Sequence, residues 1–155
     1  MSDLAMYDVV EKEKKQYIVV KIGGEQYGID ISFIDNIVRM CKITRVPKAP
    51  TYYKGVINLR GEVVPVMSLR KRMGLDEDVF TDASRIIILK LEGIGLMGVI
   101  VDEVKEVLSL SEDDIEEPTH AKKGKNSFIN GVGTNGDELI SIFEISSIIE
   151  ENEVS

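Results

Sequence analysis

The sequence predicts an all-β fold with a few short helices, organised as a duplicated five-stranded unit. Short segments rich in β-branched residues dominate the chain, and glycine or asparagine occupies nearly every gap between them. The pattern also repeats after about seventy residues. At 155 residues the chain has room for one compact domain, or for two small subdomains that share a core.

Five strands are predicted in the first half of the chain. The turns Gly23-Gly24 and Arg60-Gly61 suit tight hairpins, because glycine tolerates positive φ. Residues 32–36 have the length of one helical turn, and a short helix is expected over 69–73, closed by Gly74. Pro65 lacks a backbone donor, so its strand is expected at a sheet edge or a bulge. The predicted strands are 17–22, 26–31, 37–43, 56–59 and 63–67.

The second half repeats this arrangement. Turns at residues 93–95 and 135–137 predict two more hairpins, residues 102–104 again have the length of a helical turn, and a last helix is expected over 145–150. The predicted strands are 85–91, 96–101, 105–110, 128–132 and 139–143. The main loops are 47–54, 76–84 and 116–126.

The repeat is visible residue by residue. A shift of about seventy places Gly28 on Gly98, Ile31 on Val101, Ile34 on Val104, and Ile37-Val38 on Val107-Leu108. A period this long indicates two like subdomains rather than a solenoid. Five short antiparallel strands with no spare partner close most economically into a small barrel.

Charge and composition exclude several classes of function. The chain has 19 basic and 27 acidic residues, a formal net charge of -8, which disfavours nucleic-acid binding. No apolar run approaches the ~20 residues that span a bilayer, and the N-terminal residues have no signal-peptide core, so neither secretion nor membrane insertion is expected. We expect a cytoplasmic protein.

Catalytic and metal-binding patterns are missing from the sequence. His120 is the only histidine and Cys41 the only cysteine, and they lie far apart in the sequence, so no metal quartet or Cys/His pair is expected. The glycines lie between strands, where no phosphate loop forms. The acidic run 112–117 lacks EF-hand spacing and is interpreted as a solvated face that starts a helical turn after Ser111. We therefore expect that the protein is not an enzyme and binds no cofactor or metal. Residue counts alone do not exclude a pair of carboxylates that the fold brings together for acid/base catalysis.

One segment is distinctive. Residues 55–69 read GVINLRGEVVPVMSL and follow a Pro47-x-x-Pro50 loop. This resembles the signature of the CheW-like family, in which a Pro-x-x-Pro loop precedes G-x-x-N-L-R-G-x-x-x-P-v-x-x-L. Residues 27–31, 98–104 and 129–133 resemble the family's second strand, its G-x-x-V-D-x-V block and its late hairpin. The resemblance extends over residues 17–150.

The resemblance implies a fold of two packed, five-stranded SH3-like β-barrels with an apolar groove between them. The expected organisation is a mobile segment over 1–16, a single CheW-like domain over 17–150 and an acidic tail over 151–155. The subdomains are expected at about 17–80 and 85–150. Whether the first strands of each repeat pair in their own barrel is left open.

The resemblance also implies a non-enzymatic adaptor of bacterial chemotaxis, recruited to receptor arrays at the inner face of the membrane. Its implied partners are the helical-hairpin tip of methyl-accepting chemoreceptors, which would enter the groove, and the regulatory domain of the histidine kinase CheA. That domain has the same fold in this family and would pair pseudo-symmetrically through barrel ends.

Candidate contact residues follow from this comparison. Aliphatic candidates for the groove are Ile34, Ile37, Val56, Ile86 and Val101. Gly55 and Gly61 bracket the hairpin that displays Arg60. A turn arginine is usually just a solvated cation, but in the family the arginine of N-L-R-G is implicated in complex assembly, and Arg60 has that position. Asn36 and Ser68 depart from the acidic residues common in relatives.

Two other classes of function fit the same sequence. One is a regulatory fragment, because this fold also forms part of chemotaxis kinases and of adaptors fused to a receiver domain. Chain length favours the single-domain adaptor. The other is a small-barrel enzyme or ligand binder, which stabilisation by nucleotides or metals in a thermal-shift screen would favour.

Overall fold

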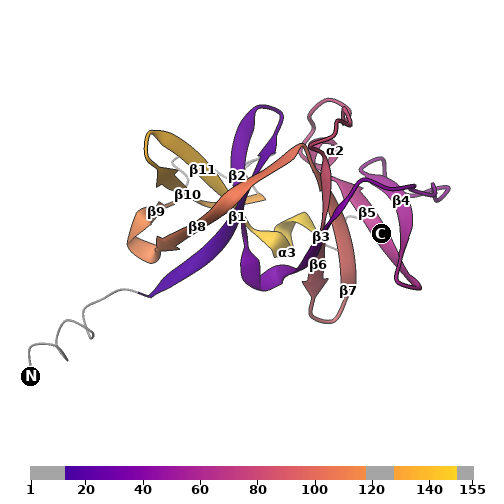
Figure 1. Ribbon diagram of the computed structural model, residues 1–155, viewed down its shortest axis with the longest axis horizontal. Coiled ribbons are helices and arrows are strands. Elements are labelled where there is room, and N and C mark those ends of the chain that lie inside the picture. Colours follow the sequence, from indigo (N-terminus) through magenta and orange to yellow (C-terminus); the bar gives the residue numbers. More distant parts are fainter. Residues whose placement is uncertain (1–12, 118–127, 150–155) are drawn as a thin grey trace, which may run out of the picture.

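Two β-sheets joined by short helical turns and loops make up the protein. The computed structural model describes residues 13–117 and 128–149, and these form eleven strands (Figure 1). The expected segment 1–16 is described only from residue 13, and strand β1 already begins at Lys14. The expected tail 151–155 lies outside the described residues.

Each sheet takes strands from both halves of the chain. The first has the order β8 (Glu103–Ser111), β1 (Lys14–Ile22), β2 (Glu25–Asp30), β11 (Glu138–Phe143), β10 (Ile129–Asn135) and β9 (Ile115–Glu116). The second has the order β3 (Ile34–Arg39), β6 (Arg85–Leu91), β7 (Gly95–Val101), β5 (Glu62–Ser68) and β4 (Tyr53–Leu59). Short helical turns η1 (Ile31–Phe33), η2 (Glu112–Asp114), α2 (Leu69–Arg72) and α3 (Ile145–Ile148) connect or close them.

The two repeats exchange their first hairpins. All four predicted hairpins form, but hairpin β1–β2 pairs with β8 and β11 of the second repeat, and hairpin β6–β7 pairs with β3 and β5 of the first. The parallel contacts are equivalent, with Gly28 opposite Ile142 in one sheet and Gly98 opposite Val66 in the other. Neither half of the chain therefore builds a sheet on its own, which answers the question that the sequence left open.

Both sheets are closed by the chain that leaves an edge strand. After β3 the chain reaches the opposite edge of its sheet, where Thr44 forms an antiparallel bridge to Val56 of β4. After β8 the chain turns through η2 into β9, which pairs with β10 at the opposite edge. This closure gives the two small barrels that the sequence predicts and removes most exposed sheet edge.

Local predictions were wrong at a few places, and one is the strand expected over 37–43, which spans Ile34–Arg39. Residues 102–104 form no helical turn, because Glu103 and Val104 pair with β1 and the Asp102 amide donates to the carbonyl of Lys21. The two-residue strand β9 was not predicted. β5 is an internal strand in the sheet order, but Pro65 itself has the edge position expected for a proline, because the pairing of β5 with β7 begins only at Val66.

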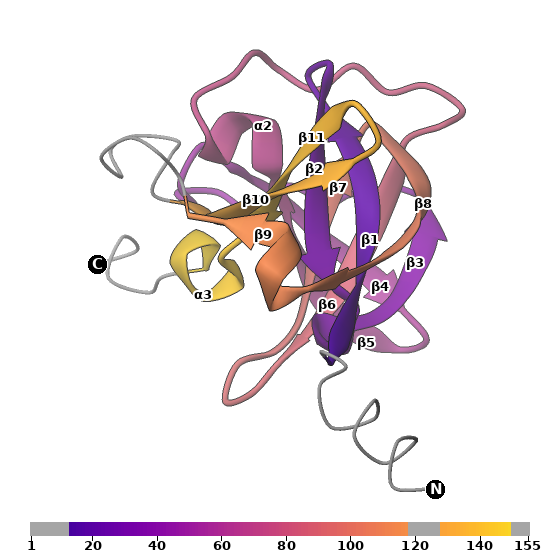
Figure 2. The same ribbon diagram turned by 90° about the vertical axis from the view of Figure 1, so that its left-hand side faces the viewer.

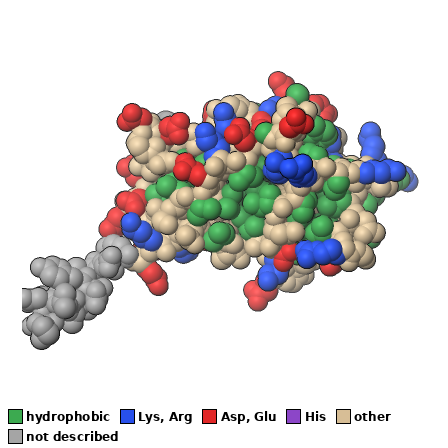
Figure 3. Space-filling model, viewed as in Figure 1, with side chains coloured by type: hydrophobic (Ala, Val, Ile, Leu, Met, Phe, Trp, Pro, Cys, Tyr) green, Lys and Arg blue, Asp and Glu red, His purple; other side chains and the backbone are tan. Residues whose placement is uncertain are grey.

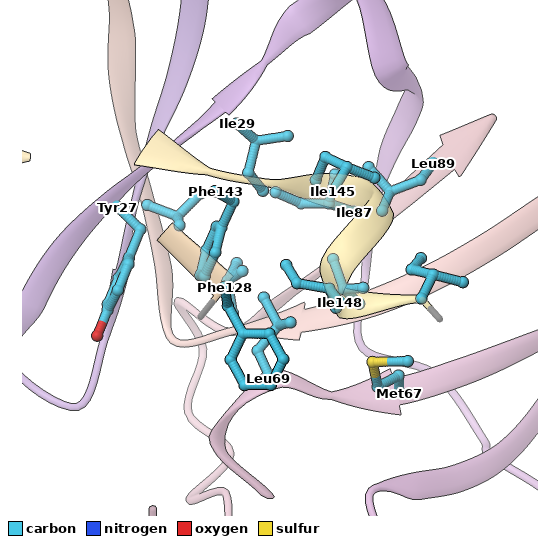
Figure 4. Close-up of a cluster of buried hydrophobic side chains, with 14 of the residues drawn as sticks. Tyr27, Ile29, Met67, Leu69, Ile87, Leu89, Phe128, Phe143, Ile145 and Ile148 are labelled. Atoms are coloured by element: carbon cyan, nitrogen blue, oxygen red, sulfur yellow. The ribbon is translucent and has the colours of Figure 1, made fainter. Parts of the chain in front are cut away.

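Apolar side chains fill the inside of each barrel and the space between the barrels. The largest cluster lies between the sheets, where Met67 and Leu69 meet Phe128, Ile145 and side chains of β6 (Figure 4). Two smaller clusters fill the barrel interiors, one around Ile86 and one around Val19. The predicted junction between the subdomains is thus largely a solid core, and a docking surface has to lie at its rim.

Candidate docking surfaces

An apolar surface follows the two equivalent strands β3 and β8. Ile37 and Val107 are 36% and 50% exposed, and Ile34 and Val104 lie half-buried against the core between the barrels. Figures 1 and 2 place β3 and β8 on the same side of the molecule, opposite α2 and α3. Figure 3 shows hydrophobic side chains gathered across the middle of this side. We call these four residues the β3–β8 face.

The β4–β5 turn presents a cation in a strained backbone. Arg60 has φ of 53° and Gly61 of 84°, and the Gly61 amide donates to Asn58 Oδ1 at 3.0 Å. A non-glycine residue in the left-handed region costs roughly 1 kcal/mol. The side chain of Arg60 is 72% exposed, and its guanidinium lies 3.7 Å from the carboxylate of Asp35 on β3. Neither the turn nor this exposed ion pair explains why an arginine stands here.

Two of the predicted contact residues are core residues. Ile86 and Val101 have no exposed surface, because β6 and β7 lie between a barrel interior and the core between the barrels. A side chain without exposed surface cannot belong to a docking face, so these two assignments are corrected. The repeating run of β-branched residues indicated burial but not how many faces of the strand were covered.

The other predicted residues divide into structural and accessible positions. Gly55 is buried against the backbone of Thr44, which gives it a structural role. Val56 is half-buried and holds the Thr44 bridge. Ile34, Ile37, Arg60 and Gly61 all retain exposed surface. The structure thus leaves two accessible groups, the β3–β8 face and the Arg60 turn.

Val104 and Val107 were missed as candidates although the sequence contained a signal for them. The repeat of about seventy residues places Ile34 on Val104 and Ile37 on Val107. Only the structure shows that the two equivalent strands lie on one side of the molecule. Applying the repeat to the first pair of candidates would have found the second pair.

Two arginines of α2 fix one barrel against the other. Arg70 donates to both carboxylate oxygens of Asp102, at 3.2 Å from Nε and 2.6 Å from Nη2, and Asp102 also accepts from the Gly23 amide at 2.9 Å. Arg72 donates to the carbonyl of Ile148 at 2.9 Å and lies 4.6 Å above the ring of Tyr52. We call the group of Arg70, Asp102 and Gly23 the Arg70 clamp.

The clamp contains an unusual electrostatic environment. Burial alone would raise the pKa of Asp102, but hydrogen bonds from Arg70 and Gly23 outweigh it and hold that pKa below its usual value. Burial raises the pKa of nearby Asp78, despite the positive charges of Lys54 and Arg70. Asp102 therefore favours folding in its charged form, and Asp78 in its neutral form.

Among the described residues, the equivalent end of the other barrel has no such clamp. By the repeat, Ser32 stands where Asp102 does, and Ser146 has the place in α3 that Arg70 has in α2. A groove of about 560 Å³ opens there, lined by Ser32, Ser146 and Ile94 among others. The barrels are therefore joined asymmetrically.

The expectation that the protein has no catalytic or metal-binding site can be compared only with the described residues. Within residues 13–117 and 128–149 no group of three or more His, Cys, Asp and Glu residues could hold a metal ion. Cys41 is exposed, and His120 lies outside the described residues. Asp114 accepts hydrogen bonds from Ser111 at the start of η2, as expected for the acidic run. No helix in the described part of the chain is long and apolar enough to cross a membrane.

Comparisons with known proteins agree with this architecture. The family model of the CheW-like domain matches residues 16–153. The chemotaxis protein CheW of Bacillus subtilis (strain 168) is 36% identical over 141 residues, 90% of each chain. CheW of Thermotoga maritima is 33% identical over 132 residues, 84% of this chain and 85% of that protein. The crystal structure of the scaffolding protein TtCheW from Thermoanaerobacter tengcongensis superposes with a TM-score of 0.82 and 34% identity, covering 89% of this chain and 94% of that chain. This chain belongs to the CheW-like domain family.

Proposed function

We propose that this protein is a chemotaxis scaffold that couples methyl-accepting chemoreceptors to the histidine kinase CheA without catalysing a reaction itself. Its family membership and its similarity to proteins named CheW support this role. The observation that carries the proposal is the exposed, apolar β3–β8 face on a rigid double barrel. Recruitment to receptor arrays at the inner face of the membrane follows from the same role.

The β3–β8 face is our candidate for the receptor contact. A helix docks into a shallow surface through aliphatic side chains at regular spacing, and it needs complementary apolar groups on rigid strands. Ile37 and Val107 supply these groups, and Ile34 and Val104 connect them to the core. Because all four residues stand on strands paired with β6 or β1, a helix would find this surface already formed.

The Arg60 turn is our candidate for the kinase contact. A guanidinium that is mostly exposed and only weakly held by Asp35 is available to a partner's carboxylates or carbonyls. The turn lies at the end of the β4–β5 hairpin, so a partner domain of the same fold can approach it without disturbing the core. The scaffold would then transmit the receptor's state through binding geometry, with a coupling free energy of about 1 to 3 kcal/mol.

Charge placed on the β3–β8 face tests the receptor contact. We expect Val107→Glu to reduce co-sedimentation with receptor-containing membranes by about tenfold or more, because a carboxylate would be buried against apolar groups. Leu139→Glu is the matched control, since Leu139 is 65% exposed on β11 of the same barrel and should tolerate the same change. Equal binding by both variants and the wild type would remove this face from the proposal.

At Arg60, a loss of function can be separated from a loss of stability. We expect Arg60→Gly to raise the free energy of unfolding by roughly 1 kcal/mol, because glycine relieves the positive φ. The same variant should lose receptor-dependent activation of the kinase, measured as phosphate transfer in membranes that contain receptor, kinase and scaffold. Arg60→Ala should also lose activation, without the gain in stability. Full activation by the glycine variant would refute the role of Arg60.

A further inference from the structure

A second concave surface lies beside the loop that carries Pro47 and Pro50. The pocket has a volume of about 1020 Å³ and lies next to the chain that leaves β3. Its apolar lining includes Val46 and Phe80, which are 47% and 51% exposed, and the half-buried Met40 and Ile43. We call it the Pro-loop pocket. It shares no residue with the β3–β8 face or the Arg60 turn.

The charge around this pocket is opposite to that of the whole protein. The chain has a formal net charge of -8, yet the pocket is lined by four cations, Arg45, Lys48, Lys54 and Lys71, and by one carboxylate, Glu77. Glu77 is 3.3 Å from Lys54 Nζ and 3.1 Å from Lys71 Nζ, and hydrogen bonds from these lysines lower its pKa. It therefore offsets only part of the positive charge. Arg45 and Lys48 have no ion pair with any residue in the described part of the chain.

The backbone at Lys48 is held in an unfavourable conformation. Lys48 has φ of 67°, which lies in the left-handed region. Asparagine and glycine adopt this conformation at a lower cost in free energy than lysine does. It shares this property only with Arg60 among the described non-glycine residues. Strain of this kind concentrates at functional positions, and here it places a cation at the edge of an apolar hollow.

We propose that the Pro-loop pocket docks an acidic segment of a partner protein that carries an apolar side chain. The cations would attract the acidic residues, and the exposed Val46 and Phe80 would bury the apolar one. The net charge of the protein repels extended polyanions such as nucleic acid and anionic membranes, and only a short segment can use this local field. A small free anion would gain nothing from the apolar lining. The Pro-loop pocket is separate from the proposed receptor and kinase contacts and would recruit a further partner to the scaffold.

Fluorescence polarisation with the full-length protein tests the pocket directly. The probe is a fluorescein-labelled synthetic peptide of alternating Glu-Glu-Phe units, and a Lys-Lys-Phe peptide and ATP serve as comparison ligands. We expect saturable binding of the acidic peptide that weakens as salt is raised, with weaker binding of both comparison ligands. Binding by Arg45→Glu combined with Lys48→Gly should weaken by about tenfold or more. Lys48→Gly relieves the strained φ, so loss of binding would not reflect loss of folding.

Two controls separate the pocket from general charge effects. Lys90→Glu changes an exposed lysine on β6 outside the pocket and should leave peptide affinity unchanged. Alkylation of Cys41, the only cysteine of the chain and a residue of the pocket lining, should weaken binding by the wild type. The proposal is overturned if no saturable binding occurs up to millimolar peptide, if ATP or the basic peptide binds as well, or if the pocket variant binds like the wild type.

Discussion

Replacement of Gly55 by alanine is expected to cost more than about 3 kcal/mol of the free energy of unfolding, a large effect for the addition of a single methyl group. A Cβ at this position would lie 2.1 Å from the carbonyl oxygen of Thr44, and φ of 142° is itself unfavourable for alanine. The displaced carbonyl accepts from the Val56 amide at 2.8 Å, in the bridge that closes the second sheet. The substitution therefore opens a barrel as well as straining the backbone of β4.

Gly136→Ala provides the matched comparison for this prediction. Gly136 also has positive φ, 66°, but no atom lies within 4 Å of an added Cβ. We expect a loss of only about 1 kcal/mol, from backbone strain alone. Urea denaturation followed by circular dichroism measures both values. Similar losses for the two variants would show that the Thr44 bridge does not hold the barrel closed.

Asp102→Asn should lower the free energy of unfolding by about 2 kcal/mol at neutral pH. The Arg70 and Asp102 side chains are only 17% and 24% exposed, so the variant leaves a guanidinium that is largely removed from water without its counter-charge. It also weakens the acceptor for the Gly23 amide, which holds the β1–β2 turn. By contrast, Lys15→Met breaks a 3.9 Å pair at a lysine that is 69% exposed and should change stability by less than about 0.5 kcal/mol.

The effect of Asp102→Asn should depend on pH with a definite sign. The folded-state pKa of Asp102 is below its unfolded value, so its stabilisation is complete above the unfolded pKa of about 4 and is lost as the pH falls through the folded pKa. The wild type should lose this contribution in acid, whereas the asparagine variant has none to lose. Denaturation at pH 7 and pH 3 measures the difference, which should narrow at pH 3. A constant difference would contradict the assignment.

Asp78 contributes in the opposite direction. Its folded-state pKa is raised, mainly by burial, so the stability it supplies is complete below the unfolded pKa and is lost as the pH rises through the folded pKa. The clamp region therefore contains one carboxylate that favours folding at neutral pH and one that opposes it. The measured pH profile of the wild type combines both, which is why the Asp102 comparison uses the difference between two variants of the same background.

Local sequence signals identified the strands and the hairpins. β-branched residues with glycine at turns predicted all four hairpins, because turn geometry and side-chain alternation act over a few residues. The signature around residues 55–69 indicated the family, and a family model matches nearly the whole chain. The apolar contact residues were predicted less accurately. Ile86 and Val101 are aliphatic, as a docking surface requires, but both are buried in the core.

The sequence by itself determined the strand-rich class, the duplication and the position of the exposed turn arginine, because these depend on residues that are neighbours in the chain. Only the tertiary structure decided that the repeats exchange hairpins, that Thr44 closes one barrel onto β4, and that Arg70 meets Asp102 and Gly23. The physical reason is that β-branched residues favour a paired strand but do not specify its partner. The partner is selected by burying apolar faces and satisfying backbone groups throughout the fold, and that selection also decides which aliphatic side chains stay at the surface to bind another protein.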